Sequence, residues 1–451
     1  MLTSRWLRKR RRDWFWCKGL IYPEINKIHF YFRLNDPYCF LLLQALPELL
    51  KTDNNGQPLT DEEIREKVNV EILLWLPAEL NVEKDKQAYY ALSDAKILAQ
   101  DYGLFFPSTT KLPEEQLTIK ATRILLANKN TCHLFSLCNQ LAEALWQNDS
   151  KLVARLEQSF GHLGEPSSSS MLQKTVVKLQ KSGHYQSGML HYAGEWYWGI
   201  DRLWHLWNRL NRQEKTVGNF ERSFKPYLSR HPKLLGRNSN DVQIKQEIKA
   251  NECIDFYFSF RSPYSYLAVE RIFAIAKRYT LKVNIKPVLP MVMRGLMVPK
   301  IKRLYIVHDA KREAERYQVP FGKISDPLGG GVEKCMALFF YAQRQGKEQA
   351  FVAKFSAAIW SKGANTRTIH VLQRLSQSIG LNWQQAKDLL TDESWQKQAE
   401  VNRRQLNELG LWGVPCFVYK GQTFWGQDRI IHLEKRIQSN HYQPSFCKNE
   451  K

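Results

Sequence analysis

The stretch that decides the fold is Ile254-Asp-Phe-Tyr-Phe-Ser-Phe-Arg-Ser-Pro-Tyr-Ser-Tyr-Leu267. From Ile254 to Phe260, large apolar residues occupy every second position, which is typical of a β-strand with one buried face. Ser262 then suits the N-cap of a helix, and Pro263 suits its first position, where a missing N–H costs nothing. The stretch therefore predicts a strand that leads within a few residues into a helix.

The same pattern occurs twice in the chain. Three pairs of segments match in the same order. They are Ile28-His-Phe-Tyr-Phe-Arg-Leu-Asn-Asp-Pro-Tyr-Cys-Phe-Leu41 with the stretch above (offset 254 − 28 = 226), Asp94-Ala-Lys96 with Asp309-Ala-Lys311 (309 − 94 = 215), and Gly194-Glu-Trp-Tyr-Trp-Gly-Ile-Asp-Arg-Leu203 with Gly421-Gln-Thr-Phe-Trp-Gly-Gln-Asp-Arg-Ile430 (421 − 194 = 227). Self-similarity in a fixed order indicates an internal repeat. We therefore expect two copies of one α/β plan: strand–helix–strand, a helical insertion, then a hairpin and a helix.

The repeat sets the expected domain bounds. We predict a basic N-terminal tail over 1–23, a first copy over 24–210, a polar linker over 211–250 and a second copy over 251–440. Hydrophobic periodicity in the second copy predicts helices over 332–345, 349–361, 366–379, 383–409 and 430–437, with strands over 416–419 and 423–425. The serine run in 166–170 predicts a flexible loop inside the first copy.

Composition bounds the class of protein. The 451 residues include 43% hydrophobic and 12% aromatic residues, which suits globular cores. The formal charge of +22 favours an anionic partner without choosing one. The basic, aromatic start could touch nucleic acid or anionic lipid, but short basic runs are more often solvated, and we expect neither a nucleic-acid nor a membrane partner. A secretory signal needs an apolar core of about 7–15 residues after its basic start, and none follows here. No stretch approaches the roughly 18 apolar residues of a membrane span, so a cytoplasmic location is expected.

The eight cysteines exclude some chemistry. No two of them have CxxC spacing, and ligand spacing typical of zinc sites is missing, so no metal is expected. A long chain without a signal also argues against a structural disulfide framework. We therefore expect most of these thiols to be small buried hydrophobes.

Three separated motifs carry a family resemblance: Ser262-Pro-Tyr-Ser265, Gly413-Val-Pro-Cys-Phe417 and Phe424-Trp-Gly-Gln-Asp-Arg429. Together they resemble the DsbA-like thioredoxin-fold family, most closely the 2-hydroxychromene-2-carboxylate isomerases and the kappa-class glutathione transferases. These branches carry Ser-Pro-Tyr-Ser where disulfide oxidoreductases carry Cys-x-x-Cys. The resemblance implies two tandem thioredoxin-like domains, each with a helical insertion. It also implies a glutathione-dependent isomerase or transferase that acts on a small electrophile.

The resemblance implies roles for the residues that would lie near the thiol of a bound glutathione. It implies that Ser262 is catalytic and donates a hydrogen bond to the thiolate of glutathione. A helix N-terminus favours such a charge, by about 0.3–1 kcal/mol when exposed. Judged without the resemblance, Ser262 could simply cap its helix. The resemblance further implies a cis Pro415 and a Val414 whose backbone binds the ligand, whereas a trans proline in an ordinary turn stays the alternative.

The ends of glutathione have expected partners too. By resemblance, Gln427 and Asp428 bind the γ-glutamyl end, and Lys302 binds the glycine carboxylate. Lys302 could equally be a solvated surface charge, because Lys300 and Arg303 lie beside it. An asparagine that the kappa transferases place upstream of this lysine has no clear match here. The substrate pocket can therefore differ, and the sequence does not name the electrophile.

The first copy departs further from the pattern. Asp36 stands in the place of Ser262, Cys39 in that of Ser265, Gly188 in that of Pro415 and Ile200 in that of Gln427. An aspartate caps a helix well, but its charge would repel a thiolate. We therefore expect the first copy to be structural or a different binding module.

Two other functions stay open at this point. One is a DsbA-family thiol oxidoreductase, which lacks the cysteine pair that thiol–disulfide exchange needs, although Cys416 could be a lone redox thiol. The other is a non-catalytic thioredoxin-fold binding or scaffold protein. A homodimer, or a pairing of the two repeats within one chain, also stays open.

Overall fold

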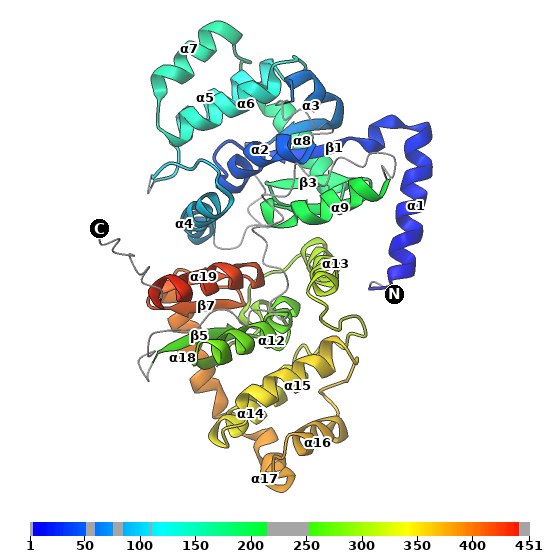
Figure 1. The fold of residues 1–451 in the computed structure, drawn as a ribbon, viewed down its shortest axis with the longest axis vertical. Coiled ribbons are helices and arrows are strands. Elements are labelled where there is room, and N and C mark those ends of the chain that lie inside the picture. The colour runs from blue at the N-terminus through cyan, green and yellow to red at the C-terminus, as the bar shows by residue number, and fades with distance from the viewer. Residues whose placement is uncertain (1–2, 51–58, 75–83, 109–110, 214–251, 442–451) are drawn as a thin grey trace, which may run out of the picture. The chain divides into compact units, whose positions relative to one another are not determined.

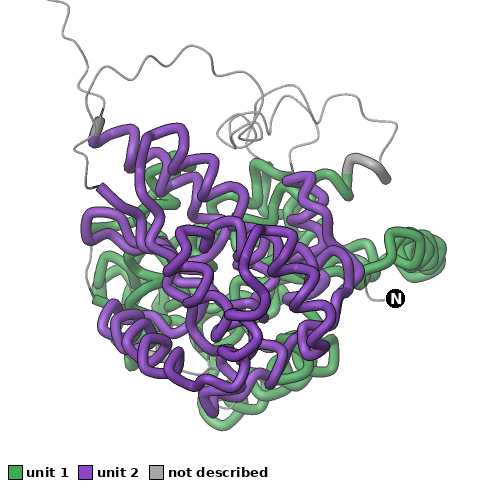
Figure 2. The backbone as a smooth tube through the Cα atoms, turned by 90° about the horizontal axis from the view of Figure 1, so that it is seen from below, with its two compact units in different colours: residues 1, 3–231, 299–305 green, residues 2, 232–298, 306–451 purple. Residues whose placement is uncertain are grey.

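The computed structural model describes residues 3–50, 59–74, 84–108, 111–213 and 252–441. It divides into two compact units, which we describe separately (Figure 2). Unit 1 contains residues 1, 3–231 and 299–305, and unit 2 contains residues 2, 232–298 and 306–451. The predicted linker, residues 211–250, lies outside the described residues except for its first three, which end helix α9.

Unit 1 is built on a four-stranded sheet with the order β2-β1-β3-β4. Strands β1 and β2 are parallel, whereas β3 is antiparallel to both β1 and β4. Phe30 and Leu190 pair at the centre of the sheet. The strands are β1 (Ile28–Phe32), β2 (Val68–Ile72), β3 (Met189–Tyr192) and β4 (Glu195–Trp198).

Unit 2 contains a sheet of the same plan, with the order β6-β5-β7-β8 and the same strand directions. Its central pair is Phe256 with Phe417, and these residues lie at the offsets 256 − 30 = 226 and 417 − 190 = 227 from the pair in unit 1. The residues that match in the sequence therefore occupy equivalent positions in the two sheets. The strands are β5 (Cys253–Phe258), β6 (Lys282–Pro287), β7 (Cys416–Tyr419) and β8 (Gln422–Trp425).

Helices surround the sheet of unit 1 (Figure 1). The predicted loop over 166–170 is wrong, because α8 begins at Ser167. Ser168 is buried there, and Leu172, Val176 and Leu179 continue its face toward the core at helical spacing. The helical elements are α1 (Arg5–Ile21), η1 (Pro23–Asn26), α2 (Pro37–Leu50), α3 (Asp61–Lys67), α4 (Lys84–Tyr102), α5 (Glu115–Ala127), α6 (Leu134–Trp146), α7 (Ser150–Phe160), α8 (Ser167–Lys181), η3 (Ile200–Arg202) and α9 (Leu203–Gln213).

Unit 2 has a helical insertion between β6 and β7, as predicted, and the hairpin and final helix follow it. One predicted helix, over 383–409, is wrong: it is broken between residues 389 and 394. Asp392 accepts hydrogen bonds from the backbone N–H (2.8 Å) and the hydroxyl (2.6 Å) of Ser394, and such local bonds compete with helix formation. The helical elements are α12 (Pro263–Arg278), η4 (Met291–Arg294), α13 (Lys300–Arg316), α14 (Gly330–Arg344), α15 (Glu348–Trp360), α16 (Ile369–Ser378), α17 (Trp383–Asp388), η5 (Leu389–Thr391), α18 (Trp395–Glu408), η6 (Gln427–Arg429) and α19 (Ile430–His441).

The alternating phenylalanines of β5 and of the residues directly after it lie in the core of unit 2. Phe256, Phe258 and Phe260 are fully buried, and the ring of Phe256 stacks on that of Phe417 at a centroid distance of 5.1 Å. Burying each such side chain contributes about 1.5–3 kcal/mol. The strand is thereby held firmly at the point where it leads into α12. Among the described residues, no helix is long and apolar enough to cross a membrane.

Candidate functional site

The site begins where β5 leads into α12. Ser262 is the N-cap of α12, and its Oγ accepts a hydrogen bond from the backbone N–H of Ser265 at 3.1 Å. The same hydroxyl donates to the carbonyl oxygen of Val414 at 3.3 Å. Both Ser262 and Val414 are partly exposed, whereas Pro263 and Pro415 beside them are buried. The hydroxyl therefore caps the helix and at the same time faces the loop before β7.

The loop before β7 has the predicted backbone geometry. The peptide bond between Val414 and Pro415 is cis, which confirms the sequence prediction. Cys416 follows, fully buried, with its Sγ donating to the carbonyl oxygen of Gly413 at 3.0 Å. Burial raises the pKa of this thiol well above its ordinary value, so Cys416 stays protonated at neutral pH. It behaves as a buried thiol rather than a reactive thiolate.

A second loop lies beside the first. The backbone N–H of Gly426 donates to the carbonyl oxygen of Pro415 at 2.8 Å, which ties the loop after β8 to the loop before β7. Gln427 and Asp428 follow directly, in the short helix η6. Asp428 is partly exposed, whereas Gln427 is fully buried. The structure therefore brings together Ser262, Val414, Pro415 and the Gln427–Asp428 pair.

Gln427 is held by a buried polar network. Its side-chain nitrogen donates to Oε2 of Glu313 at 2.7 Å and to Oδ1 of Asp428. Its side-chain oxygen accepts from Nη1 of Arg271, which also donates to the backbone oxygen of Gln427 at 3.0 Å. The Arg271 guanidinium lies over the ring of Tyr317, 3.8 Å from its centre. Both amide hydrogens of Gln427 are therefore used inside the protein, and one of them orients Asp428.

Sequence reasoning missed Arg271 and Glu313. A signal was available for Arg271, because it is a charged residue among the apolar residues of α12, between Val269 and Phe273. A charge that is buried in this way needs a hydrogen-bonding partner. That the partner is Gln427, more than 150 residues later, is visible only in the fold.

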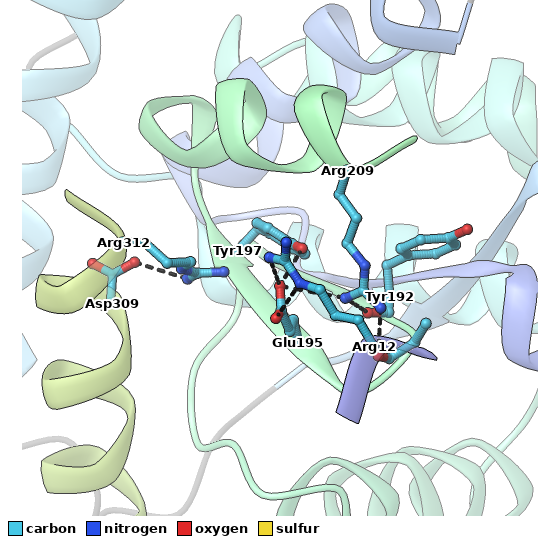
Figure 3. Close-up of polar contacts among 8 residues, drawn as sticks. Arg12, Tyr192, Glu195, Tyr197, Arg209, Asp309 and Arg312 are labelled. Atoms are coloured by element: carbon cyan, nitrogen blue, oxygen red, sulfur yellow. Dashed lines mark hydrogen bonds and ion pairs between the residues drawn. The ribbon is translucent and has the colours of Figure 1, made fainter. Parts of the chain in front are cut away.

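A further polar pair lies at the start of α12. The hydroxyl of Tyr264 donates to Oδ2 of the buried Asp309 at 2.7 Å. Arg312 donates to the other oxygen of Asp309 at 2.8 Å (Figure 3). The aspartate that matched in the sequence repeat thus fixes the helix that carries Ser262.

The comparisons with known proteins match this half of the chain. The model of the DsbA-like thioredoxin domain family matches residues 253–438, and this part of the chain is a DsbA-like thioredoxin domain. Curated relatives of this domain are 2-hydroxychromene-2-carboxylate isomerases. The protein of that name from Sphingobium xenophagum is 29% identical over 194 residues, which are 41% of this chain and 97% of that protein. The one from Pseudomonas putida is 24% identical over 192 residues, 41% of this chain and 93% of that protein.

Two solved structures are also similar to this part of the chain. A 2-hydroxychromene-2-carboxylate isomerase matches with a TM-score of 0.37 and 24% identity, covering 42% of this chain and 97% of that chain. The cytosolic disulfide reductase DsbM from Pseudomonas aeruginosa matches with a TM-score of 0.31 and 19% identity, covering 42% of this chain and 96% of that chain.

Lys302 is the one predicted site residue outside unit 2. It lies in the first turn of α13, in the segment 299–305 that belongs to unit 1. Its ammonium lies 5.7 Å from the centre of the Tyr185 ring, and burial lowers its pKa. The other five predicted residues belong to unit 2. The role of Lys302 toward a carboxylate stays a prediction.

Unit 1 keeps some features of the DsbA-like domain. Tyr38 donates to Asp94 at 2.8 Å, as Tyr264 does to Asp309. The backbone N–H of Arg33 donates to Sγ of Cys39 at 3.3 Å. The equivalent bond in unit 2 joins the N–H of Ser259 to Oγ of Ser265 at 3.4 Å.

The place of Ser262 is filled differently in unit 1. Asp36 accepts from the backbone N–H of Tyr38 at 2.9 Å and from the hydroxyl of Ser187 at 2.5 Å. Gly188, in the place of Pro415, has a positive φ of 67°, and a side chain there would meet Asp36 and Tyr38. The aspartate is therefore satisfied within unit 1 rather than presented to a thiolate.

The buried polar network is also absent at the equivalent positions of unit 1. Arg271, Glu313 and Gln427 correspond by offset to positions 45 (271 − 226), 98 (313 − 215) and 200 (427 − 227). These positions hold three buried apolar residues, Ala45, Leu98 and Ile200. None of the three positions in unit 1 therefore holds a polar side chain.

Proposed function

We propose that the DsbA-like domain binds glutathione and acts as a glutathione-dependent isomerase or transferase on a small electrophile, in the manner of the 2-hydroxychromene-2-carboxylate isomerases that it resembles. The observation that carries the proposal is the Ser262 hydroxyl, at the N-terminus of α12 and 3.3 Å from the carbonyl oxygen of Val414. A donor at this place can hold a ligand's thiolate, because the helix N-terminus favours negative charge.

The hydrogen bonds of Ser262 suggest how the site responds to a ligand. Its hydroxyl donates to the Val414 carbonyl, while its oxygen accepts from the N–H of Ser265. A peptide-like ligand whose own N–H donates to the Val414 carbonyl replaces the serine there. The hydroxyl is then able to rotate toward the ligand's sulfur without losing the helix cap.

Asp428 supplies the other end of the proposed site. Its carboxylate is partly exposed and is oriented by the amide of Gln427. A carboxylate in this position suits the ammonium of a γ-glutamyl group, and charge-assisted hydrogen bonds are stronger than neutral ones. Gln427 itself acts through Asp428, because both of its amide hydrogens are already used.

The chemistry of the proposed isomerisation needs no oxidant. The glutathione thiolate adds to a carbon of a conjugated double bond, and the π electron pair moves to the conjugated carbonyl oxygen. The former double bond is now single and rotates. The electron pair then returns, the carbon–sulfur bond breaks, and the thiolate leaves with the substrate isomerised. Ser262 stabilises the thiolate before addition and after elimination, which is nucleophilic catalysis with a borrowed nucleophile.

The thiol oxidoreductase alternative has less support. Thiol–disulfide exchange needs a reactive thiolate and a second thiol. Serines occupy both places in Ser262-Pro-Tyr-Ser265, and Cys416 is buried and protonated. A binding or scaffold function without catalysis is the outcome if glutathione does not bind.

Unit 1 has a sheet like that of unit 2 but different residues at the place of the proposed site. We propose that residues 24–210 are a second thioredoxin-like copy, since the order, direction and register of its sheet repeat those of unit 2. It does not bind glutathione, because Asp36 replaces the serine and the network around Gln427 has become apolar.

Calorimetric titration with glutathione tests the proposal. The wild-type chain is expected to bind with a Kd between about micromolar and millimolar. Asp428→Ala, which removes the partner of the γ-glutamyl ammonium, is expected to weaken binding by about tenfold or more. Absence of binding by the wild type would overturn the proposal. Binding would justify a screen of aromatic acids with conjugated double bonds.

A further inference from the structure

Helix α1 is held on unit 1 by one face. Two of the side-chain nitrogens of Arg12, Nε and Nη2, donate to the carboxylate of Glu195, at 2.8 and 2.7 Å (Figure 3). The ring of Phe15 packs against the core of unit 1, and Gly19 is buried, with its carbonyl accepting from Asn26 at 3.2 Å. Residues 12, 15 and 19 recur at helical spacing, so they define the inner face of α1. The segment predicted as a solvated tail therefore contains a docked helix.

Helix α1 and its C-cap residue Tyr22 also expose an unusual set of side chains. Seven of the fourteen large hydrophobic side chains that are exposed in the described part of the chain lie between Trp6 and Tyr22. Leu20 and Ile21 are 67% and 71% exposed, and Trp6 is 60% exposed. Scattered exposed hydrophobics are normal, but a concentration of them marks an interaction surface. We call the exposed residues Trp6, Leu7, Trp14, Trp16, Leu20, Ile21 and Tyr22 the α1 apolar surface.

Basic residues are interleaved with this surface. Helix α1 contains seven Lys and Arg residues and one acidic residue, Asp13. The Lys18 ammonium lies 4.1 Å from the centre of the Trp14 ring, and the Arg10 guanidinium lies 4.6 Å from that of Trp6. Two of the basic side chains of α1 therefore lie directly against indole rings of the same helix. Trp side chains favour the boundary between membrane and water, and Lys and Arg there attract anionic headgroups.

We propose that helix α1 docks the protein on the surface of an anionic lipid bilayer, with the α1 apolar surface entering the headgroup region. The helix lies in the plane of the interface rather than across it, since a segment with seven basic residues is not a membrane span. This goes beyond the proposed enzyme function and does not depend on it. It also replaces the expectation, drawn from the sequence, of a protein without a membrane partner.

Two other occupants fit the surface less well. Nucleic acid would pair with the basic residues and could stack on tryptophans, but Leu20 and Ile21, the most exposed of the set, would gain nothing from it. A second copy of α1 would bring two strongly basic helices together, and like charges repel. An anionic bilayer satisfies both the charge and the aliphatic side chains.

Flotation of the full-length protein with lipid vesicles tests the proposal. Vesicles that contain phosphatidylglycerol with phosphatidylcholine are expected to bind at least about tenfold more protein than vesicles of phosphatidylcholine alone. Binding is expected to fall as salt is added, because salt screens the attraction. Equal binding to both kinds of vesicle, or to neither, would overturn the proposal. Retention on DNA without vesicle binding would assign the helix to nucleic acid instead.

A matched pair of variants separates the surface from general hydrophobicity. Trp14→Ser with Leu20→Ser and Ile21→Ser removes exposed apolar side chains from α1 and is expected to lower vesicle binding about tenfold or more. Ile369→Ser with Val401→Ser removes exposed apolar side chains from unit 2 and is expected to leave binding unchanged. All five side chains are exposed, so both variants should unfold thermally as the wild type does. Equal vesicle binding by the two variants would contradict the assignment to α1.

Discussion

At the scale of single residues, the two serines of the Ser262-Pro-Tyr-Ser265 turn differ in burial and in the hydrogen bonds they make. Ser265 is fully buried and accepts a hydrogen bond from the backbone of Ser259. Ser262 is partly exposed and faces the Val414 carbonyl. Only Ser262 is therefore placed to meet a ligand, and its substitution must separate its role as a helix cap from its proposed role as a thiolate donor.

Ser262→Asp and Ser262→Ala make this separation. Aspartate caps a helix as well as serine does, as Asp36 does in unit 1, so Ser262→Asp should keep the wild-type stability within about 0.5 kcal/mol. Ser262→Ala should lose about 1 kcal/mol. Both variants should lose glutathione-dependent turnover by about a hundredfold or more, because neither offers a donor to the thiolate. Denaturant unfolding and steady-state assays measure the two effects. Turnover in Ser262→Asp near the wild-type level would rule out the donor role.

The burial of Cys416 leads to a chemical prediction. Its raised pKa keeps the thiol protonated, and a buried thiol is also inaccessible. A thiol reagent added to the native protein at neutral pH should therefore modify the exposed Cys17 and Cys132 and leave Cys416 unmodified until the protein unfolds. Peptide mapping by mass spectrometry reads out each position. Rapid native modification of Cys416 would instead revive a redox role.

At the scale of elements, the helix α12 and the loop after β8 are joined through Arg271, Gln427 and Glu313. Burying such polar groups is costly, and well-packed apolar residues can replace them at little or no loss of stability. The corresponding positions of unit 1 hold three buried apolar residues, Ala45, Leu98 and Ile200. Retention of the polar version in unit 2 therefore fits a functional use, which we place in the orientation of Asp428.

A comparison of single and triple variants tests this use. Gln427→Ile alone removes the buried amide that Arg271 and Glu313 both contact and should destabilise the protein by about 3 kcal/mol. Adding Arg271→Ala and Glu313→Leu copies unit 1 and should recover part of that loss. Glutathione affinity should nevertheless stay low in the triple variant, since Asp428 is no longer oriented. Denaturant unfolding and calorimetry give the two numbers. Wild-type affinity in the triple variant would show that the network serves stability alone.

The helices and strands also show which parts of the structure the sequence could predict. Strand β7 occurs at the predicted residues, Cys416–Tyr419, because its pattern is local. The break at 389–394 and the helix that begins at Ser167 were mispredicted, since serine and aspartate serve caps, turns and helix starts alike. The sequence could not predict that the side chain of Gln427 points into the protein, for another reason. This orientation depends on Arg271, which comes close only when the sheet is assembled.

At the scale of the whole molecule, each of the two units contains a four-stranded sheet, and the two sheets have the same strand order and the same register at their centres. Matching sheets do not imply matching sites, because function lies in the residues placed on a fold. Here the Tyr–Asp pair that fixes the first helix is present in both units, whereas the residues at the positions of Ser262, Pro415 and Gln427 differ. The motifs were enough to predict the thioredoxin-like fold of the second copy. The difference between the hydrogen bonds around Ser262 in unit 2 and those around Asp36 in unit 1 is visible only in the structure.

This contrast predicts the stoichiometry of glutathione binding. Calorimetry on the full chain should give about one site per chain rather than two, since only unit 2 combines Ser262, the Val414 carbonyl and an oriented Asp428. Asp201 matches Asp428 in the repeat (428 − 227 = 201) and provides the control. Asp201→Ala should leave the affinity and the stoichiometry unchanged, whereas Asp428→Ala should weaken the single site. Two sites per chain, or equal effects of the two substitutions, would show that unit 1 also binds the ligand and that its aspartate is no obstacle.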